Sequence, residues 1–129
     1  MSYKQEIGRW GEGIAAAFLK RKGYTIIDRN YFTPEGELDI IALLEEQDEQ
    51  VLVFVEVKTR TSDKYGYPEE AFSQKKWNHM LKAIGLYFQK QPDYEEAWQI
   101  DLIAIQKLSG KEPVDIQHFE NIVMGYGRD

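Results

Sequence analysis

Residues 51–60 read Val-Leu-Val-Phe-Val-Glu-Val-Lys-Thr-Arg, and this stretch decides the predicted fold. Its aliphatic first half is typical of a strand that is buried on both faces. Because strand side chains alternate between two faces, Glu56 and Lys58 share one face with Leu52 and Phe54. A carboxylate and an ammonium at the end of a core strand are unfavourable unless they are paired or bind something. A structural salt bridge is the simplest interpretation of the pair alone.

A second strand is predicted at residues 36–44, where Asp39 stands among aliphatic side chains. The polar connection between the two strands is too short for a crossover helix, so the strands must form an antiparallel hairpin. If the turn is centred between Gln47 and Asp48, residues whose numbers sum to 95 face each other. Every apolar residue then gains an apolar partner, which favours this register over a slip of one residue. The register places Asp39 opposite Glu56.

Two facing carboxylates have a chemical consequence. Directly opposed side chains have Cβ atoms roughly 4.5–5.5 Å apart, so Asp39 and Glu56 would repel unless a cation or a shared proton lay between them. Two hard oxygen ligands suit Mg²⁺, which keeps several waters, and Mn²⁺ can substitute for it. Such an ion can polarise a phosphoryl oxygen and supply a hydroxide nucleophile. Lys58 could orient that nucleophile or neutralise charge on the phosphate. The pattern predicts a phosphodiester-cleaving site with Asp39 and Glu56 as metal ligands.

These residues also carry a family resemblance. Residues 36–41, Gly-Glu-Leu-Asp-Ile-Ile, followed by residues 53–60, resemble the PD-(D/E)XK nuclease superfamily. The chain is more closely similar to the YraN-type endonuclease-like proteins of bacteria, which are similar to archaeal Holliday-junction resolvases. The resemblance covers nearly the whole chain, and its other matches are residues 9–12, Arg29-Asn30, Ser73, Lys76, Ile100-Asp101 and residues 118–121. The Pro that names the superfamily is Leu38 here, and Gln99 stands where an Arg is expected. Because of the departure at Gln99, the role of the strand at residues 97–105 stays open. We interpret Asp101 in this strand as a structural acid.

The resemblance implies a Mg²⁺-dependent endonuclease that acts on DNA, with branched or junction DNA as the candidate substrate. It implies that Glu12 reaches the metal site as an accessory acid, whereas the helical pattern alone favours a solvated glutamate. Lys76 flanks the apolar stripe of the second long helix, where it could lean over the sheet toward the site. A snorkelling surface lysine fits the same pattern. Because junction resolvases act as dimers, a homodimer is expected by analogy.

The predicted phosphate contacts are Arg29, Arg60 and Lys76, although Arg29 fits a simple surface cation equally well. The net charge of −6 argues against DNA binding, because phosphate neutralisation drives affinity for DNA. Four of the acids lie in the turn at residues 45–50 and can point away from a substrate. The charge predicts weak, salt-sensitive binding. It also favours the main alternative, a nuclease-fold protein that binds nucleic acid or a protein partner without cutting. A purely structural Asp–Glu–Lys cluster is a third possibility.

Length and composition predict one globular domain over residues 1–129, with 43% hydrophobic and 29% charged residues. There is no cysteine, which excludes disulfides and thiolate metal sites. The sequence shows no signal peptide and no apolar run of the ~18 residues that a membrane helix needs. The cytoplasm, without a membrane, is the expected location.

The predicted order of elements is α-β-β-β-α-β-β. The first helix is predicted at residues 3–22, the first strand at residues 24–31, and the second helix from Pro68. The two late strands are predicted at residues 97–105 and 114–119. This order indicates an α/β domain with a mixed central β-sheet flanked by helices, which is restriction-endonuclease-like.

Overall fold

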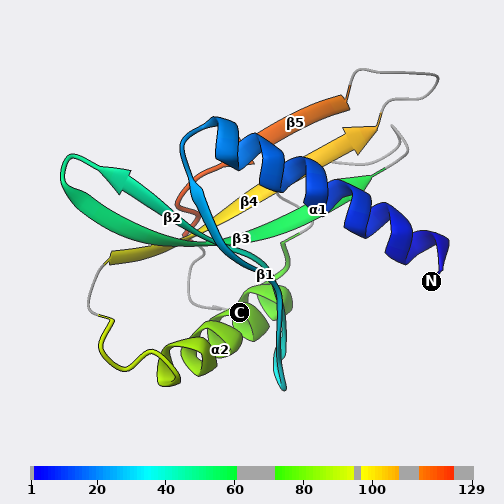
Figure 1. Ribbon diagram of the computed structural model, residues 1–129. Coiled ribbons are helices and arrows are strands. Elements are labelled where there is room, and N and C mark those ends of the chain that lie inside the picture. Colours follow the sequence, from blue (N-terminus) through cyan, green and yellow to red (C-terminus); the bar gives the residue numbers. More distant parts are fainter. Residues whose placement is uncertain (1, 61–71, 95–96, 108–113, 124–129) are drawn as a thin grey trace.

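The computed structural model describes residues 2–60, 72–94, 97–107 and 114–123. Its elements follow the predicted order α-β-β-β-α-β-β (Figure 1). They are α1 (Tyr3–Arg21), β1 (Thr25–Thr33), β2 (Gly36–Glu46), β3 (Glu49–Arg60), α2 (Gln74–Gln89), β4 (Ala97–Lys107) and β5 (Val114–Phe119).

The strands form one five-stranded mixed sheet in the order β1-β2-β3-β4-β5. The β1–β2, β2–β3 and β4–β5 pairs are antiparallel, whereas β3 and β4 are parallel. Two parallel neighbours need a crossover connection, and α2 lies in that connection. The fold is therefore α/β with a mixed sheet and a helix on each face, compatible with a restriction-endonuclease-like fold, as predicted.

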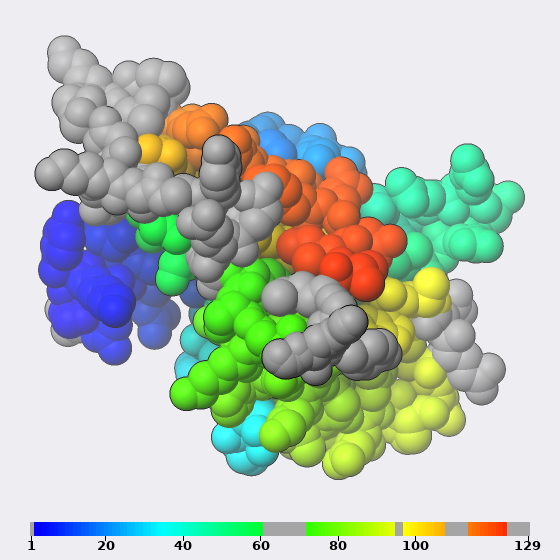
Figure 2. Space-filling model, turned by 180° about the vertical axis from the view of Figure 1, so that it is seen from behind, coloured from blue at the N-terminus to red at the C-terminus, as the bar shows by residue number. Residues whose placement is uncertain are grey.

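The two faces of the sheet hold separate cores. Leu52 and Phe54 of β3 pack with α2, whereas Val53 and Val55 pack with α1. All four side chains are almost fully buried, which is why this strand reads as a nearly continuous apolar run. Seen from behind, α2 forms much of the surface of its face, and the β2–β3 turn projects to one side (Figure 2). The sheet thus presents Glu56 to the side covered by α2.

The predicted hairpin register is confirmed from Ile40–Val55 to Glu46–Glu49, where partner numbers sum to 95. The turn residues Gln47 and Asp48 have φ of 50° and 71°, as a tight hairpin turn requires.

The prediction that regular pairing continues through Asp39 and Glu56 is wrong, because the described pairing of β2 with β3 ends at Ile40–Val55. Beyond that pair the Val57 N–H donates to Asp39 Oδ2 at 2.9 Å. The acceptor of this N–H is therefore a side chain of β2, whereas in regular strand pairing it would be a backbone carbonyl of β2.

Both helices begin at a serine that acts as an N-cap. Ser2 forms a capping box with Gln5 ahead of α1, in agreement with the predicted start of that helix. The predicted start of α2 at Pro68 is wrong for the observed helix, which begins at Gln74. Ser73 is extended (φ −72°, ψ 164°), and its side chain accepts the Lys76 N–H. Pro68 itself lies outside the described residues.

A buried polar cluster joins β4 to β5. The Asp101 side chain is 0% exposed, accepts hydrogen bonds from Gln99 Nε2 and the Asn121 N–H, and lies 2.7 Å from His118 Nε2. Lys22 Nζ lies 2.8 Å from His118 Nδ1. Because an ammonium can only donate, Nδ1 must accept, and Nε2 carries the proton that is donated to Asp101. Asp101 is therefore a structural acid, as interpreted from the sequence.

Candidate active site

Asp39 and Glu56 lie on neighbouring strands, just beyond the last regular pair of the hairpin. Asp39 is half-buried and Glu56 is 7% exposed. Burial and the neighbouring charge of Glu56 raise the pKa of Asp39 to about 8, although the hydrogen bond from Val57 acts in the opposite direction. Burial also raises the pKa of Glu56, while Lys76 and Lys58 partly counteract this effect. Two carboxylates that disfavour each other's charge form the centre of the site.

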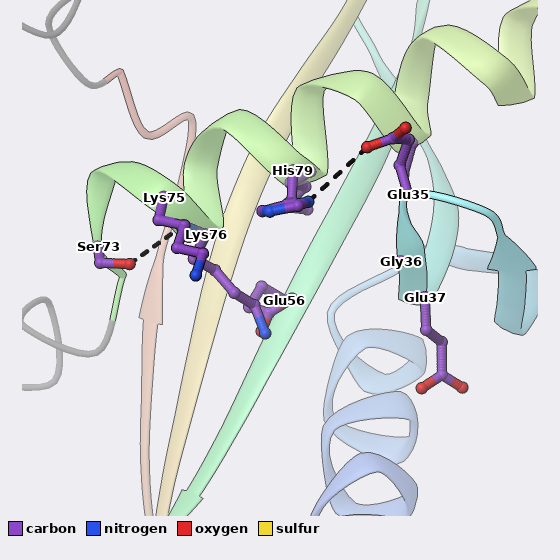
Figure 3. Close-up of a pocket in the computed structure, with 10 residues that line it drawn as sticks. Glu35, Gly36, Glu37, Glu56, Ser73, Lys75, Lys76 and His79 are labelled. Atoms are coloured by element: carbon purple, nitrogen blue, oxygen red, sulfur yellow. Dashed lines mark hydrogen bonds and ion pairs between the residues drawn. The ribbon is translucent and has the colours of Figure 1, made fainter.

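Lys76 is the direct partner of Glu56. Its Nζ lies 2.7 Å from Glu56 Oε2, and its side chain is 52% exposed at the rim of the site. Figure 3 shows Lys76 reaching from the first turn of α2 toward Glu56. Lys76 thus lies over the sheet, which is one of the two positions that the helical spacing permitted. Its part in catalysis stays a prediction.

Lys58 lies two residues beyond Glu56 and is exposed. Its charge lowers the pKa of Glu56. Among the ion pairs of the described residues, however, Glu56 is bound by Lys76 and not by Lys58. Glu56 and Lys58 therefore do not form the simple salt bridge that the sequence suggested. The side chain of Lys58 is exposed to solvent instead.

Glu12 approaches from α1. Its Oε1 accepts a hydrogen bond from Asn30 Nδ2 at 2.8 Å, and its charge raises the pKa of both Asp39 and Glu56. Glu12 is thus electrostatically coupled to the two acids and is not merely solvated. Asn30 was not selected from the sequence as a site residue. It has φ of 54° inside β1, a left-handed conformation that asparagine tolerates and that is unusual in a strand.

Arg29 and Arg60, the other predicted phosphate contacts, lie on β1 and at the end of β3. Arg29 is exposed and Arg60 is half-buried. In the part of the chain that the structure describes, neither side chain forms an ion pair with Asp39 or Glu56, and contact with nucleic acid stays a prediction for both.

A cavity of about 360 Å³ opens between the tip of the β1–β2 hairpin and α2 (Figure 3). One side carries acids, because Glu35 and Glu37 from the hairpin join Glu56 there. The α2 side carries bases, which are Lys75, Lys76 and His79. His79 Nδ1 lies 3.8 Å from Glu35 Oε1 across the mouth. Of the two coupled carboxylates, Glu56 therefore lines the cavity and faces the basic side chains of α2, whereas Asp39 lies behind it on β2.

The donor set fits a hydrated hard cation. Among the described residues, no three His, Cys, Asp or Glu side chains gather closely enough to form a complete metal cage. Mg²⁺ does not need such a cage, because it is commonly held by one or two carboxylates and keeps several waters. Asp39 and Glu56 supply two such carboxylates, and the crowding between them is what a divalent ion would relieve.

Fold and site together define the class: an α/β protein in which a β-hairpin carries two coupled carboxylates, and the following helix brings a lysine to one of them beside a cavity. The chain belongs to the family described as "Uncharacterised protein family UPF0102", whose family model matches residues 11–105. This confirms the closer part of the resemblance, to YraN-like proteins. The matched region includes all of the candidate site residues proposed from the sequence.

Several bacterial proteins are similar to this chain over nearly their whole length, and each is described only as a UPF0102 protein. The protein of Syntrophomonas wolfei is 40% identical over 86% of this chain and 93% of its own length. That of Syntrophotalea carbinolica is 39% identical over 92% of this chain and 93% of its own. That of Alkaliphilus oremlandii is 40% identical over 91% and 97%.

Neither helix of the described residues is both long enough and apolar enough to cross a lipid bilayer.

Proposed function

We propose that this protein is a Mg²⁺-dependent endonuclease of the PD-(D/E)XK superfamily that hydrolyses DNA phosphodiester bonds, with branched or junction DNA as the candidate substrate. The observation that carries the proposal is the electrostatic coupling of Asp39 and Glu56 on neighbouring strands, with Lys76 bound to Glu56 where Glu56 lines a cavity. Coupled, perturbed carboxylates in a cleft are a feature of functional sites, because a structural role would favour well-separated or fully paired charges. Mn²⁺ should substitute for Mg²⁺.

Each residue has a distinct part in the proposal. Asp39 and Glu56 would hold the ion, which when bound supplies a Lewis acid and makes water a stronger nucleophile. Lys58, exposed on the same strand, would orient the attacking water or neutralise charge that develops on the phosphate. Glu12, held by Asn30, would accept a hydrogen bond from a water at the site. Lys76 would contact the phosphate from the α2 side.

The α2 side of the cavity supports a phosphate contact in the proposal, although the chain as a whole carries a net charge of −6. Lys75, Lys76 and His79 lie on this side, while Glu35, Glu37 and Glu56 line the opposite side, where a divalent ion would offset their charge. The distant acids of the β2–β3 turn would be screened by salt. We infer weak, salt-sensitive binding, in which a homodimer acting in the cytoplasm could offer one site to each of two symmetry-related strands of a four-way junction.

The test is cleavage of linear duplex and four-way-junction DNA by the wild type, Asp39→Asn and the control Asp48→Asn. Asp48 lies in the exposed β2–β3 turn, so its substitution changes the net charge equally without touching the site. We expect products in Mg²⁺ and none in chelator, with Asp39→Asn at least about a hundredfold slower. Identical background rates for the wild type and Asp39→Asn across substrates and metals would overturn the enzyme proposal.

The second candidate is a nuclease-fold protein that binds nucleic acid or a protein partner without cutting. The observations in its favour are the Lys76–Glu56 ion pair and the lack, among the described residues, of a third acid close enough to complete a cage. Gel shifts that occur without metal and without turnover would select this candidate. A purely structural cluster requires Lys58→Ala to destabilise the fold, which its exposed position makes the least supported of the three.

A further inference from the structure

The strongest unexplained feature of the site is that a lysine lies where a divalent ion would bind. Lys76 Nζ lies 2.7 Å from Glu56 Oε2, which is the range of a strong charge-assisted hydrogen bond. The Glu56 side chain is only 9% exposed, and the Lys76 side chain is 52% exposed. The buried partner is therefore fixed, while the exposed partner is free to leave.

The local charges explain why Glu56 takes this partner. Glu12 places negative charge near Glu56, and Glu37 places negative charge near Lys76. Without a cation, the buried carboxylate would lie uncompensated among these acids, which is strongly unfavourable. Lys76 supplies one positive charge at this point. A divalent ion held by Asp39 and Glu56 would supply two, and its repulsion of the ammonium would remove the reason for the ion pair.

Lys76 can move without disturbing the fold. Its backbone N–H is fixed by Ser73 Oγ at the helix start, but its four-carbon stem has many rotamers, and its ammonium is a compact donor. It also lines the cavity that Lys75 and His79 share. A lysine released from Glu56 would therefore remain at the cavity and face any phosphate bound there.

We propose that Lys76 is an exchangeable cation: it neutralises Glu56 in the metal-free protein and is displaced to the substrate phosphate when a divalent ion binds. The inference rests on the proposed function, since it requires the ion to bind at Asp39 and Glu56. It couples the two ligands, because the ion frees the lysine for the phosphate and the phosphate holds the lysine away from Glu56. Such coupling is reciprocal.

The test measures Mn²⁺ affinity by electron paramagnetic resonance, without DNA, at about pH 8.5, where protons compete least for carboxylates. Lys76→Met removes the competing charge and should bind Mn²⁺ roughly three- to tenfold more tightly than the wild type. Lys75→Met is the matched control: it removes a neighbouring charge from the same cavity wall, and Lys75 forms none of the ion pairs found among the described residues. It should change Mn²⁺ affinity by less than about twofold.

A second variant guards against misfolding. Lys76→Gln keeps a donor for Glu56 without the charge, and it should also bind Mn²⁺ more tightly, with an unchanged circular dichroism spectrum. A second readout is the binding of fluorescent junction DNA in Ca²⁺ and in chelator. The wild type should gain more affinity from Ca²⁺ than Lys76→Met does.

The outcomes separate this inference from the proposed function. If wild type binds Mn²⁺, Asp39→Asn does not, and neither Lys76 variant binds more tightly, the exchange is refuted while the metal site stands. If Lys75→Met tightens binding as much as Lys76→Met, the effect is general electrostatics, and the exchange is again refuted. If wild type does not bind Mn²⁺ at all, the proposed function fails and this inference fails with it.

Discussion

Replacing Asp39 by asparagine is expected to stabilise the metal-free protein, although removing a half-buried, hydrogen-bonded side chain usually destabilises. Burial and the charge of Glu56 raise the pKa of Asp39 to about 8 from its ordinary value of 3.8. Asparagine has nearly the same shape, and its Oδ1 can still accept the Val57 N–H. The substitution removes the unfavourable charge and keeps the shape of the side chain. Stability often rises when a charged functional site is neutralised in this way.

The sign of the pH dependence follows from proton binding. Between about pH 4 and about pH 8, folded Asp39 keeps a proton that the unfolded chain has lost. The free energy of unfolding therefore falls as pH rises through this range. The free energy of unfolding is lowest above about pH 8, where Asp39 is ionised in the folded protein. The asparagine variant has no proton to lose at this position and should lack this part of the slope.

The ordinary and the raised pKa of Asp39 also set an upper limit on the gain in the free energy of unfolding. They differ by about 4, and a pKa difference of one corresponds to about 1.36 kcal/mol, which gives a ceiling of about 6 kcal/mol. Glu56 and Lys76 can readjust when the charge is removed, so the measured gain should be smaller. We expect about 1–3 kcal/mol at pH 8.5 and a clearly smaller gain at pH 5.5.

The assay is urea unfolding in chelator at both pH values, with wild type, Asp39→Asn and Asp48→Asn. Asp48 lies in an exposed turn with φ of 71°, which asparagine accepts, so this control isolates the change in net charge. An Asp39→Asn protein that is less stable than wild type at both pH values would show that the charge of Asp39 does not destabilise the folded protein. If Asp48→Asn gained as much stability, the gain would follow from net charge and not from the site.

Three further predictions concern packing, the polar cluster and nucleic-acid contact. Gly11→Ala should lose about 1–3 kcal/mol in the free energy of unfolding, because its Cβ would clash with the Thr59 hydroxyl. Gly8→Ala, with open space around it, should gain up to about 1 kcal/mol, and equal effects would contradict this packing. His118→Ala should lose about 2–4 kcal/mol by urea unfolding, because it leaves the buried Asp101 short of a donor; a loss near zero would contradict it. Arg29→Ala should reduce the salt slope of DNA binding by about one, and an unchanged slope would exclude a phosphate contact.

The fold could be predicted because its patterns are local and mutually consistent. Both faces of β3 are apolar, so only one register of the β2–β3 hairpin gives every apolar residue a partner, and that register is the one found. The same register brought Asp39 and Glu56 to neighbouring positions on adjacent strands. The start of α2 was mispredicted because proline is favoured in a first helical turn, but Ser73 provides the cap.

The sequence indicated that Lys76 could approach the site, but not that it pairs with Glu56 or that Asn30 binds Glu12, because these contacts depend on how distant elements cross the sheet. Sequence spacing placed Lys58 beside Glu56, yet Lys76 of α2 forms the ion pair. The Glu12–Asn30 hydrogen bond joins α1 to the interior of β1, between the pairs Arg29–Ile40 and Tyr31–Leu38. Helical and strand periods specify which face a side chain takes. They do not specify where a helix on that face passes over the strand.

Whether Asp39 and Glu56 hold a divalent ion is tested most directly by the anomalous scattering of a crystal of this protein soaked in Mn²⁺. We expect one strong peak within about 2.1 Å of a carboxylate oxygen of Asp39 and of Glu56, with waters completing the coordination. In the same crystal, Lys76 Nζ should have left Glu56. A fully soaked crystal with no peak there, or with a peak that touches neither acid, would show that these two residues do not hold the ion.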